Sequence, residues 1–179
     1  MLEQAGIEYR VIPAAIDEAT IKVRFAEAEA AAAELARTKA LHVSEDHAGD
    51  WVIGSDSIVS VEGRMFDKPG SRAEAAEHLH FFSGKALRLT SAVALATGKR
   101  IDWVHVETST LQVRRLSEGF INDYLEGEWP AVGGCVGVFR MEGRGVQLFE
   151  SVEGSHFTIL GMPLIPLLGA LRERCILPS

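Results

Sequence analysis

Cysteine is scarce in this sequence, which holds Cys135 and Cys175 and no other among its 179 residues. Two cysteines cannot form a framework of several disulfides, and neither has the cysteine and histidine spacing of a zinc site. The sequence also lacks a run of the roughly 18–20 apolar residues that a membrane helix needs, and its start shows no basic segment followed by an apolar one. We therefore expect a reduced, soluble, cytoplasmic protein with no signal peptide and no membrane partner.

An excess of positive charge is lacking as well, because 25 acidic residues face 18 basic ones and the formal net charge is −7. This balance argues against a protein that binds nucleic acid through a generally basic surface. A small anionic substrate stays compatible with it, provided that local lysines or a divalent cation offset the charge. Internal repeats and low-complexity tracts are absent too, so we expect one domain over residues 1–179.

Apolar, β-branched stretches alternate with helix-forming ones along the chain, which predicts an α/β fold. Strands are expected at 51–61, 87–96, 101–113 and 146–152, with a short extended piece at 7–12. Helices are expected at 26–43, 71–82, 117–125 and 163–174. Ser71 and Glu74 have the spacing of a capping box, and Thr97-Gly98-Lys99 predicts a hairpin turn.

Asp56 is the first candidate for chemistry, because it lies within an otherwise apolar strand. Burying a carboxylate is costly unless it is paired or binds a cation, so Asp56 is a candidate metal ligand or general base. The ordinary alternative is an aspartate on a solvated edge of the sheet. Gly54, two residues earlier, would let the backbone of the strand approach a ligand closely.

Other charged residues are weaker candidates when each is taken alone. Lys68 precedes a proline and could point its ammonium at a phosphate, but both it and Lys39 could equally be solvated surface lysines. Asp17 and Glu18 could supply carboxylates, or could simply complement a helix dipole. The glycine-rich segment 133–145 is expected to be a loop or irregular strand, although it lacks the spacing of a standard phosphate loop. The six histidines are scattered and are interpreted as structural.

Seven short motifs nevertheless follow one another in an order that resembles the Maf family of nucleoside triphosphate pyrophosphatases. They are Asp17-Glu18, Thr38-Lys39-Ala40, Gly54-Ser55-Asp56-Ser57, Asp67-Lys68-Pro69, Ser83-Gly84, Glu142-Gly143 and Leu160-Gly161-Met162-Pro163-Leu164. The resemblance covers nearly the whole chain. It implies a Maf/ITPase-like α/β fold, with a mixed, twisted sheet and helices on both of its faces. It also implies hydrolysis of a nucleoside triphosphate to the monophosphate and pyrophosphate, Mg²⁺ or Mn²⁺ as cofactor, and a homodimer.

The resemblance also implies a role for individual residues. Asp56 matches the family's proton acceptor and, with Glu18, would hold the metal. Lys39 and Lys68 match the lysines that face the triphosphate. These roles are physically coherent, because a substrate with about four negative charges needs local cations to bind a protein of net charge −7.

Ser57 and Glu142 match positions that are tied to the choice of base. Members that act on thymidine and uridine triphosphates carry glutamine where this sequence has Glu142, whose surroundings resemble the branch that acts on 7-methyl-GTP. A carboxylate can accept two hydrogen bonds from the N1–H and N2–H₂ edge of guanine, and it would favour the positive charge that methylation of N7 adds. Ser57 departs from the residue expected in either branch, so the preferred base stays open.

The start of the sequence departs from the family pattern. The family opens with a strand and a Ser-x-Ser-x-x-Arg phosphate loop, whereas residues 1–7 resemble the end of the helix that follows them. The resemblance therefore predicts that the first strand and the phosphate loop are missing from residues 1–179. The alternative function is then a catalytically weak nucleotide-binding or regulatory protein. A third interpretation is a structural α/β domain in which Asp56 and the lysines are merely solvated.

Overall fold

The computed structural model describes residues 1–47 and 49–178, and it confirms the α/β class. Five strands are hydrogen-bonded in the order β2-β1-β3-β4-β5, and the pairs β1–β2 and β4–β5 are antiparallel. The strands are β1 (Val52–Val61), β2 (Arg64–Phe66), β3 (Ala86–Thr97), β4 (Arg100–Val113) and β5 (Phe149–Glu153). Gly98 and Lys99 both have positive φ between β3 and β4, as the predicted tight turn requires.

Six α-helices and three short 3₁₀ helices are described along the chain. The α-helices are α1 (Glu18–Lys22), α2 (Ala28–Ser44), α3 (Arg72–Phe82), α4 (Glu118–Glu128), α5 (His156–Ile159) and α6 (Leu164–Glu173). The 3₁₀ helices are η1 (Glu3–Ala5), η2 (Ala131–Gly134) and η3 (Arg144–Leu148). Among residues 1–47 and 49–178, none of these helices has the length and apolar character of a membrane span.

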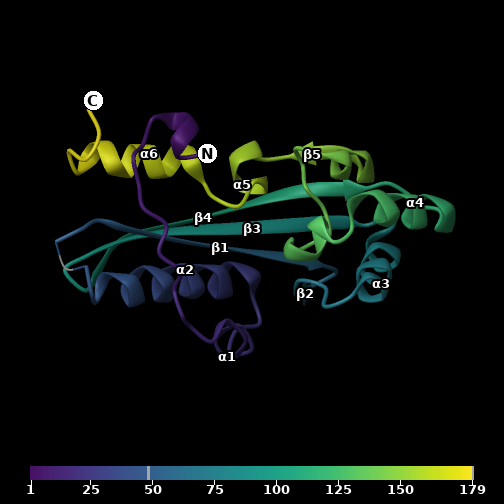
Figure 1. Ribbon diagram of the computed structural model, residues 1–179, viewed down its shortest axis with the longest axis horizontal. Helices are drawn as coiled ribbons and strands as arrows, with labels where there is room; N and C mark the ends of the chain where they lie inside the picture. The colour runs from purple at the N-terminus through teal and green to yellow at the C-terminus, as the bar shows by residue number, and fades with distance from the viewer. Residues whose placement is uncertain (48, 179) are drawn as a thin grey trace. The chain divides into compact units, whose positions relative to one another are not determined.

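The chain divides into two compact units. Unit 1 comprises Met1–Ser57, Thr90–Glu107 and Ser155–Ser179, and unit 2 comprises Ile58–Leu89 and Thr108–Gly154. In unit 1, helix α2 lies on one face of the strands and α6 on the opposite face (Figure 1). Val93 and Leu95 of β3 pack in one apolar cluster with Leu164, Leu167 and Leu171 of α6.

The other face of unit 1 is covered by α2 at unusually short range. Ala36 and Ala40 on this helix are completely buried, and small side chains allow close approach. A Cβ added to Gly54 would lie 2.6 Å from the backbone nitrogen of Ala40, and closer still to the backbone oxygen of Ala36. The close approach that we predicted at Gly54 is therefore made by the backbone of α2, which fills the space a ligand would need.

In unit 2, helix α3 begins at the predicted cap. The Ser71 hydroxyl accepts a hydrogen bond from the Glu74 backbone N–H at 3.1 Å. The Glu74 carboxylate accepts one from the Gly70 N–H at 2.8 Å, one residue earlier than in a standard capping box. The buried ring of Phe66 packs edge-on against His78 and Phe82, with centroids 5.1 and 4.7 Å apart, and fixes α3 against β2.

Loss of this cap tests the start of α3. Ser71→Ala is expected to lower the free energy of unfolding by about 1 kcal/mol, because the N–H of Glu74 loses its acceptor. In a chain of this length the melting temperature should fall by roughly 2–4 °C in a thermal scan followed by circular dichroism. Ser71→Asp restores an acceptor and should retain the stability of the parent; equal losses in both variants would contradict the capping role.

The predicted strand at 146–152 is partly wrong. Residues 146–148 belong to η3, and β5 begins at Phe149. The physical reason is the turn that precedes it: a Cβ on Gly145 would lie 2.7 Å from the backbone nitrogen of Arg140, so the chain folds back on itself there. The β-branched and apolar residues after Gly145 predict a strand, but this turn delays the extended conformation to Phe149.

Candidate functional site

Three of the predicted site residues meet in unit 1 around one ammonium group. The Lys39 Nζ atom lies 2.6 Å from Asp56 Oδ1 and 2.7 Å from Glu18 Oε1. Lys39 is brought there by the packing of α2 on β1, because its neighbour Ala40 touches Gly54 on the strand face that also carries Asp56. The Asp56 side chain is only 13% exposed, whereas that of Glu18 is 52% exposed and faces solvent. The buried carboxylate is thus paired, as the cost of burial requires.

The Asp17-Glu18 pair divides its two predicted roles between its residues. Asp17 is the N-cap of α1, accepting hydrogen bonds from the backbone N–H and the hydroxyl of Thr20 at 3.1 and 2.6 Å. Glu18, the first residue of the helix, turns its carboxylate to Lys39. Asp17 therefore stabilises the start of the helix, as the first of the two predictions had it. Glu18 lies where a carboxylate of the site would be, as the second had it.

The charge state of Lys39 follows from two opposing effects. Burial lowers the pKa of Lys39, but the hydrogen bonds to Asp56 and Glu18 and the charges of both carboxylates raise it further, so that the net pKa lies above the ordinary value of lysine. A raised lysine pKa means that the ammonium contributes its stabilisation at neutral pH and loses it only as the pH rises through that value. Lys39 is therefore a cation across the physiological range.

The two carboxylates also fit a divalent cation. They already converge on one positive group, the Lys39 ammonium, which shows that a cation can contact both. Among residues 1–47 and 49–178, no group of three or more histidine, cysteine, aspartate or glutamate side chains is arranged to hold a metal. Mg²⁺ is commonly bound by one or two carboxylates, with water and substrate phosphates completing its shell. Asp56 and Glu18 therefore suit a metal that arrives with a phosphate substrate.

Ser57 lies on the opposite face of β1 from Asp56, since neighbouring side chains of a strand alternate. Its hydroxyl lies 2.7 Å from that of Ser91 and donates to the backbone oxygen of Gly161 at 3.2 Å. Ser55, on the same face, donates to the same oxygen at 3.0 Å. These serines tie β1 to the turn before α6, a role that we did not predict although the alternation of Ser55 and Ser57 could have suggested it.

Unit 2 holds the two remaining predicted residues, Lys68 and Glu142, and both are exposed. Burial raises the pKa of the Cys135 thiol, whereas the charge of Arg140 lowers it, that of Glu142 raises it and that of Lys68 lowers it. Unit 2 therefore carries a lysine and a carboxylate, the two residue types predicted to contact phosphate and base.

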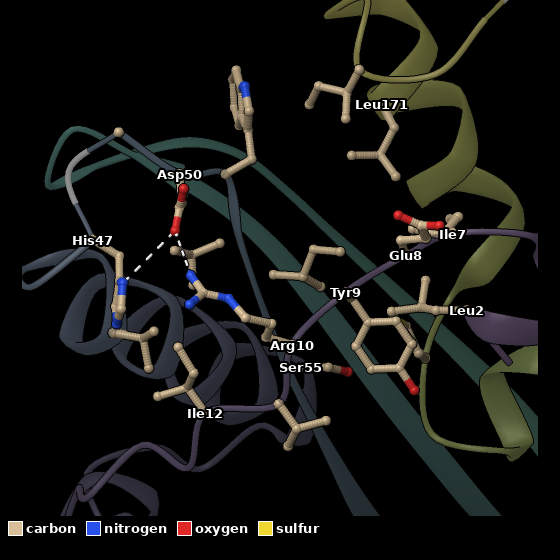
Figure 2. Close-up of a pocket in the computed structure, with 18 residues that line it drawn as sticks. Leu2, Ile7, Glu8, Tyr9, Arg10, Ile12, His47, Asp50, Ser55 and Leu171 are labelled. Atoms are coloured by element: carbon tan, nitrogen blue, oxygen red, sulfur yellow. Dashed lines mark hydrogen bonds and ion pairs between the residues drawn. The ribbon is translucent and has the colours of Figure 1, made fainter.

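Unit 1 also contains an apolar groove of about 880 Å³. Figure 2 shows Leu2, Tyr9 and Leu171 around it, with Arg10 and His47 both directed to the Asp50 carboxylate. Arg10 pairs with Asp50 at 2.9 Å, so this cation is already neutralised. Within the described residues the lining includes none of the predicted site residues and no lysine. The groove is thus poorly suited to a triphosphate.

Comparison with known proteins adds a second kind of observation to this geometry. Residues 1–174 match the family model Maf, described as Maf-like protein. The chain belongs to the Maf family. The resemblance that the seven motifs predict is confirmed, and with it the expected fold.

Relatives with two different names are similar to this Maf family member. A nucleoside triphosphate pyrophosphatase of Granulibacter bethesdensis is 47% identical over 97% of this chain and 90% of its own length. A 7-methyl-GTP pyrophosphatase of Rhizobium etli is 42% identical over 97% of this chain and 89% of its own. Another 7-methyl-GTP pyrophosphatase, from Brucella suis, is 41% identical over 98% of this chain and 91% of its own length.

Proposed function

We propose that this protein is a hydrolase that cleaves a nucleoside triphosphate to the monophosphate and pyrophosphate. The observation that carries the proposal is the contact of the Lys39 ammonium with both Asp56 and Glu18, at the positions of three family motifs. The alternative of a weak nucleotide-binding or regulatory protein is not favoured, because relatives matched over about nine tenths of their length are named as pyrophosphatases.

In the proposed mechanism Asp56 is the general base. Water attacks a phosphorus of the anhydride, its proton passes to the Asp56 carboxylate, and the bond between the α- and β-phosphoryl groups breaks with its electron pair leaving on the departing phosphate oxygen. Lys39, which stays charged, binds the triphosphate and orients Asp56. A divalent cation held by Asp56 and Glu18 would supply further neutralisation of the phosphate charge.

The residues outside this cluster keep the roles that the family resemblance implies. We propose that Lys68 contacts the phosphates and that Glu142 reads the base, with 7-methylguanine the base that suits a carboxylate best. A contact of Ser57 with the substrate stays a prediction, as do the homodimer, the cytoplasmic location and the single domain over residues 1–179.

The proposed activity is tested by pyrophosphate release across a panel of nucleoside triphosphates that includes 7-methyl-GTP, GTP, UTP and TTP. We expect turnover of at least one nucleotide with Mg²⁺ or Mn²⁺, and its loss when EDTA removes the metal, because two lysines alone cannot offset the negative charge of the triphosphate and of the two carboxylates. Turnover that EDTA does not affect would contradict a requirement for the metal. Binding of nucleotides without any pyrophosphate release would favour the regulatory alternative.

Glu142→Gln tests the choice of base. The variant keeps the shape of the side chain but can no longer accept two hydrogen bonds from guanine with a full negative charge. The preference in kcat/KM for 7-methyl-GTP over UTP and TTP should fall by an amount corresponding to roughly 1–3 kcal/mol, the value of a hydrogen bond to a charged group. Unchanged ratios across the bases would remove Glu142 from base recognition.

A further inference from the structure

Two arginines bind the loop that carries Glu142 to helix α4, one on each side of it. Arg140, two residues before Glu142, donates to Glu128 Oε2 at 3.0 Å. Arg144, two residues after it, donates to Asp123 Oδ2 at 2.6 Å. The short segment between them is therefore fixed at both ends to one helix of unit 2.

Helix α4 also holds the loop further upstream. Tyr124 and Glu128 are four residues apart on this helix, and so are Asp123 and Gly127, so the members of each pair are neighbours on its surface. Tyr124, completely buried, donates to the backbone oxygen of Val138 at 2.9 Å and fixes that residue at a φ of 61°, which a β-branched residue rarely adopts. Gly127 leaves room for the Arg144 guanidinium, which an added Cβ would meet.

The two arginine pairs differ in burial, and this difference decides which pair contributes more to holding the loop that carries Glu142. The Glu128 side chain is 8% exposed, and its partner Arg140 is 40% exposed. Asp123 is 68% exposed and Arg144 is 39% exposed. Exposed pairs contribute little because solvent screens them, whereas a buried carboxylate strongly requires its partner. The orientation of the loop thus depends chiefly on Glu128.

We propose that Glu128 is a positioning residue for base selection: through Arg140 it fixes the segment that presents Glu142 to the base. This inference rests on the proposed role of Glu142, and it assigns to a buried residue on α4 a share in the specificity of the site. Glu128 itself does not contact the substrate. Its removal should therefore change the discrimination between bases more than it changes the folding of unit 2.

Glu128→Gln is the variant of choice, because it keeps the shape and one acceptor oxygen and leaves Arg140 partly solvated. The kcat/KM preference for 7-methyl-GTP over UTP is expected to fall about tenfold, below the roughly 10²-fold that a misplacement of 1 Å can cost. The matched control Asp123→Asn removes the charge of the exposed pair and should change the ratio less than about twofold. The double variant Glu128→Gln/Glu142→Gln should show the ratio of Glu142→Gln alone, because both act through one contact.

The outcomes separate this inference from the function on which it rests. A lowered ratio in Glu142→Gln with an unchanged ratio in Glu128→Gln overturns the positioning role and leaves base reading intact. An unchanged ratio in Glu142→Gln overturns both.

Hydrogen exchange gives a readout that needs no turnover. Amides of residues 140–145 should exchange at least about tenfold faster in Glu128→Gln than in Asp123→Asn, since local opening follows the loss of buried contacts. Equal exchange in the two variants overturns the positioning role even if no nucleotide is hydrolysed.

Discussion

Replacing Gly54 by alanine is expected to lower the free energy of unfolding by about 3 kcal/mol, the upper end of what overpacking usually costs. The added Cβ would lie 2.6 Å from the backbone nitrogen of Ala40 and 2.9 Å from its Cβ. Neither a strand nor a helix backbone can yield by rotating a side chain, so α2 must move away from β1. A thermal scan should show the melting temperature falling by roughly 6–12 °C for a chain of this size.

The same displacement should reach the site, because Lys39 precedes Ala40 on α2 and contacts Asp56 two residues after Gly54. Pyrophosphate release by Gly54→Ala should therefore fall even at temperatures where the variant is folded. The control is Gly119→Ala on α4, where an added Cβ meets no atom within 4 Å and alanine favours the helix. Equal stability of the two variants would contradict the close packing of α2 on β1.

Replacing Asp56 by asparagine is expected to lower kcat by at least about 10²-fold, the usual contribution of a general base. Asparagine has nearly the same shape, but it accepts no proton and brings no negative charge to Lys39 or a metal. The far-ultraviolet circular dichroism should stay that of the parent, because the amide oxygen can still accept a hydrogen bond from Lys39.

The matched control for this variant is Asp46→Asn, which removes an exposed carboxylate of the same unit. It should retain the kcat of the parent. If Asp56→Asn also kept most of the activity, Asp56 would not be the base, and the contact with Lys39 would be an ordinary buried ion pair.

The local signals explain how much of the fold could be predicted. The cap at Ser71 and the turn at Gly98-Lys99 each depend on residues that are close together in the sequence, and the structure contains both. The start of β5 could not be predicted, because it depends on the contact of Gly145 with the Arg140 backbone rather than on strand propensity. Gly54 predicts a close approach, but the sequence alone does not say whether a ligand or a helix makes it.

The site shows a similar division. Glu18, Lys39 and Asp56 are ordinary charged residues when each is considered alone, and only their order in family motifs suggests that they meet. Their meeting depends on the packing of α2 against β1, which brings positions 17 residues apart within hydrogen-bonding distance. The anchoring of the Glu142 loop by Glu128 could not be predicted, because a glutamate near the end of a helix has no pattern that distinguishes a buried side chain from a solvated one.

We expect this protein to hydrolyse the bond between the α- and β-phosphoryl groups of a nucleoside triphosphate. The most direct test is the identity of the products, measured by phosphorus NMR or ion-exchange chromatography on a complete digest of the best nucleotide in the panel. We predict nucleoside monophosphate and pyrophosphate in equal amounts, with no diphosphate intermediate. Nucleoside diphosphate with orthophosphate, or an intact triphosphate after prolonged incubation with Mg²⁺ and Mn²⁺, would contradict the account.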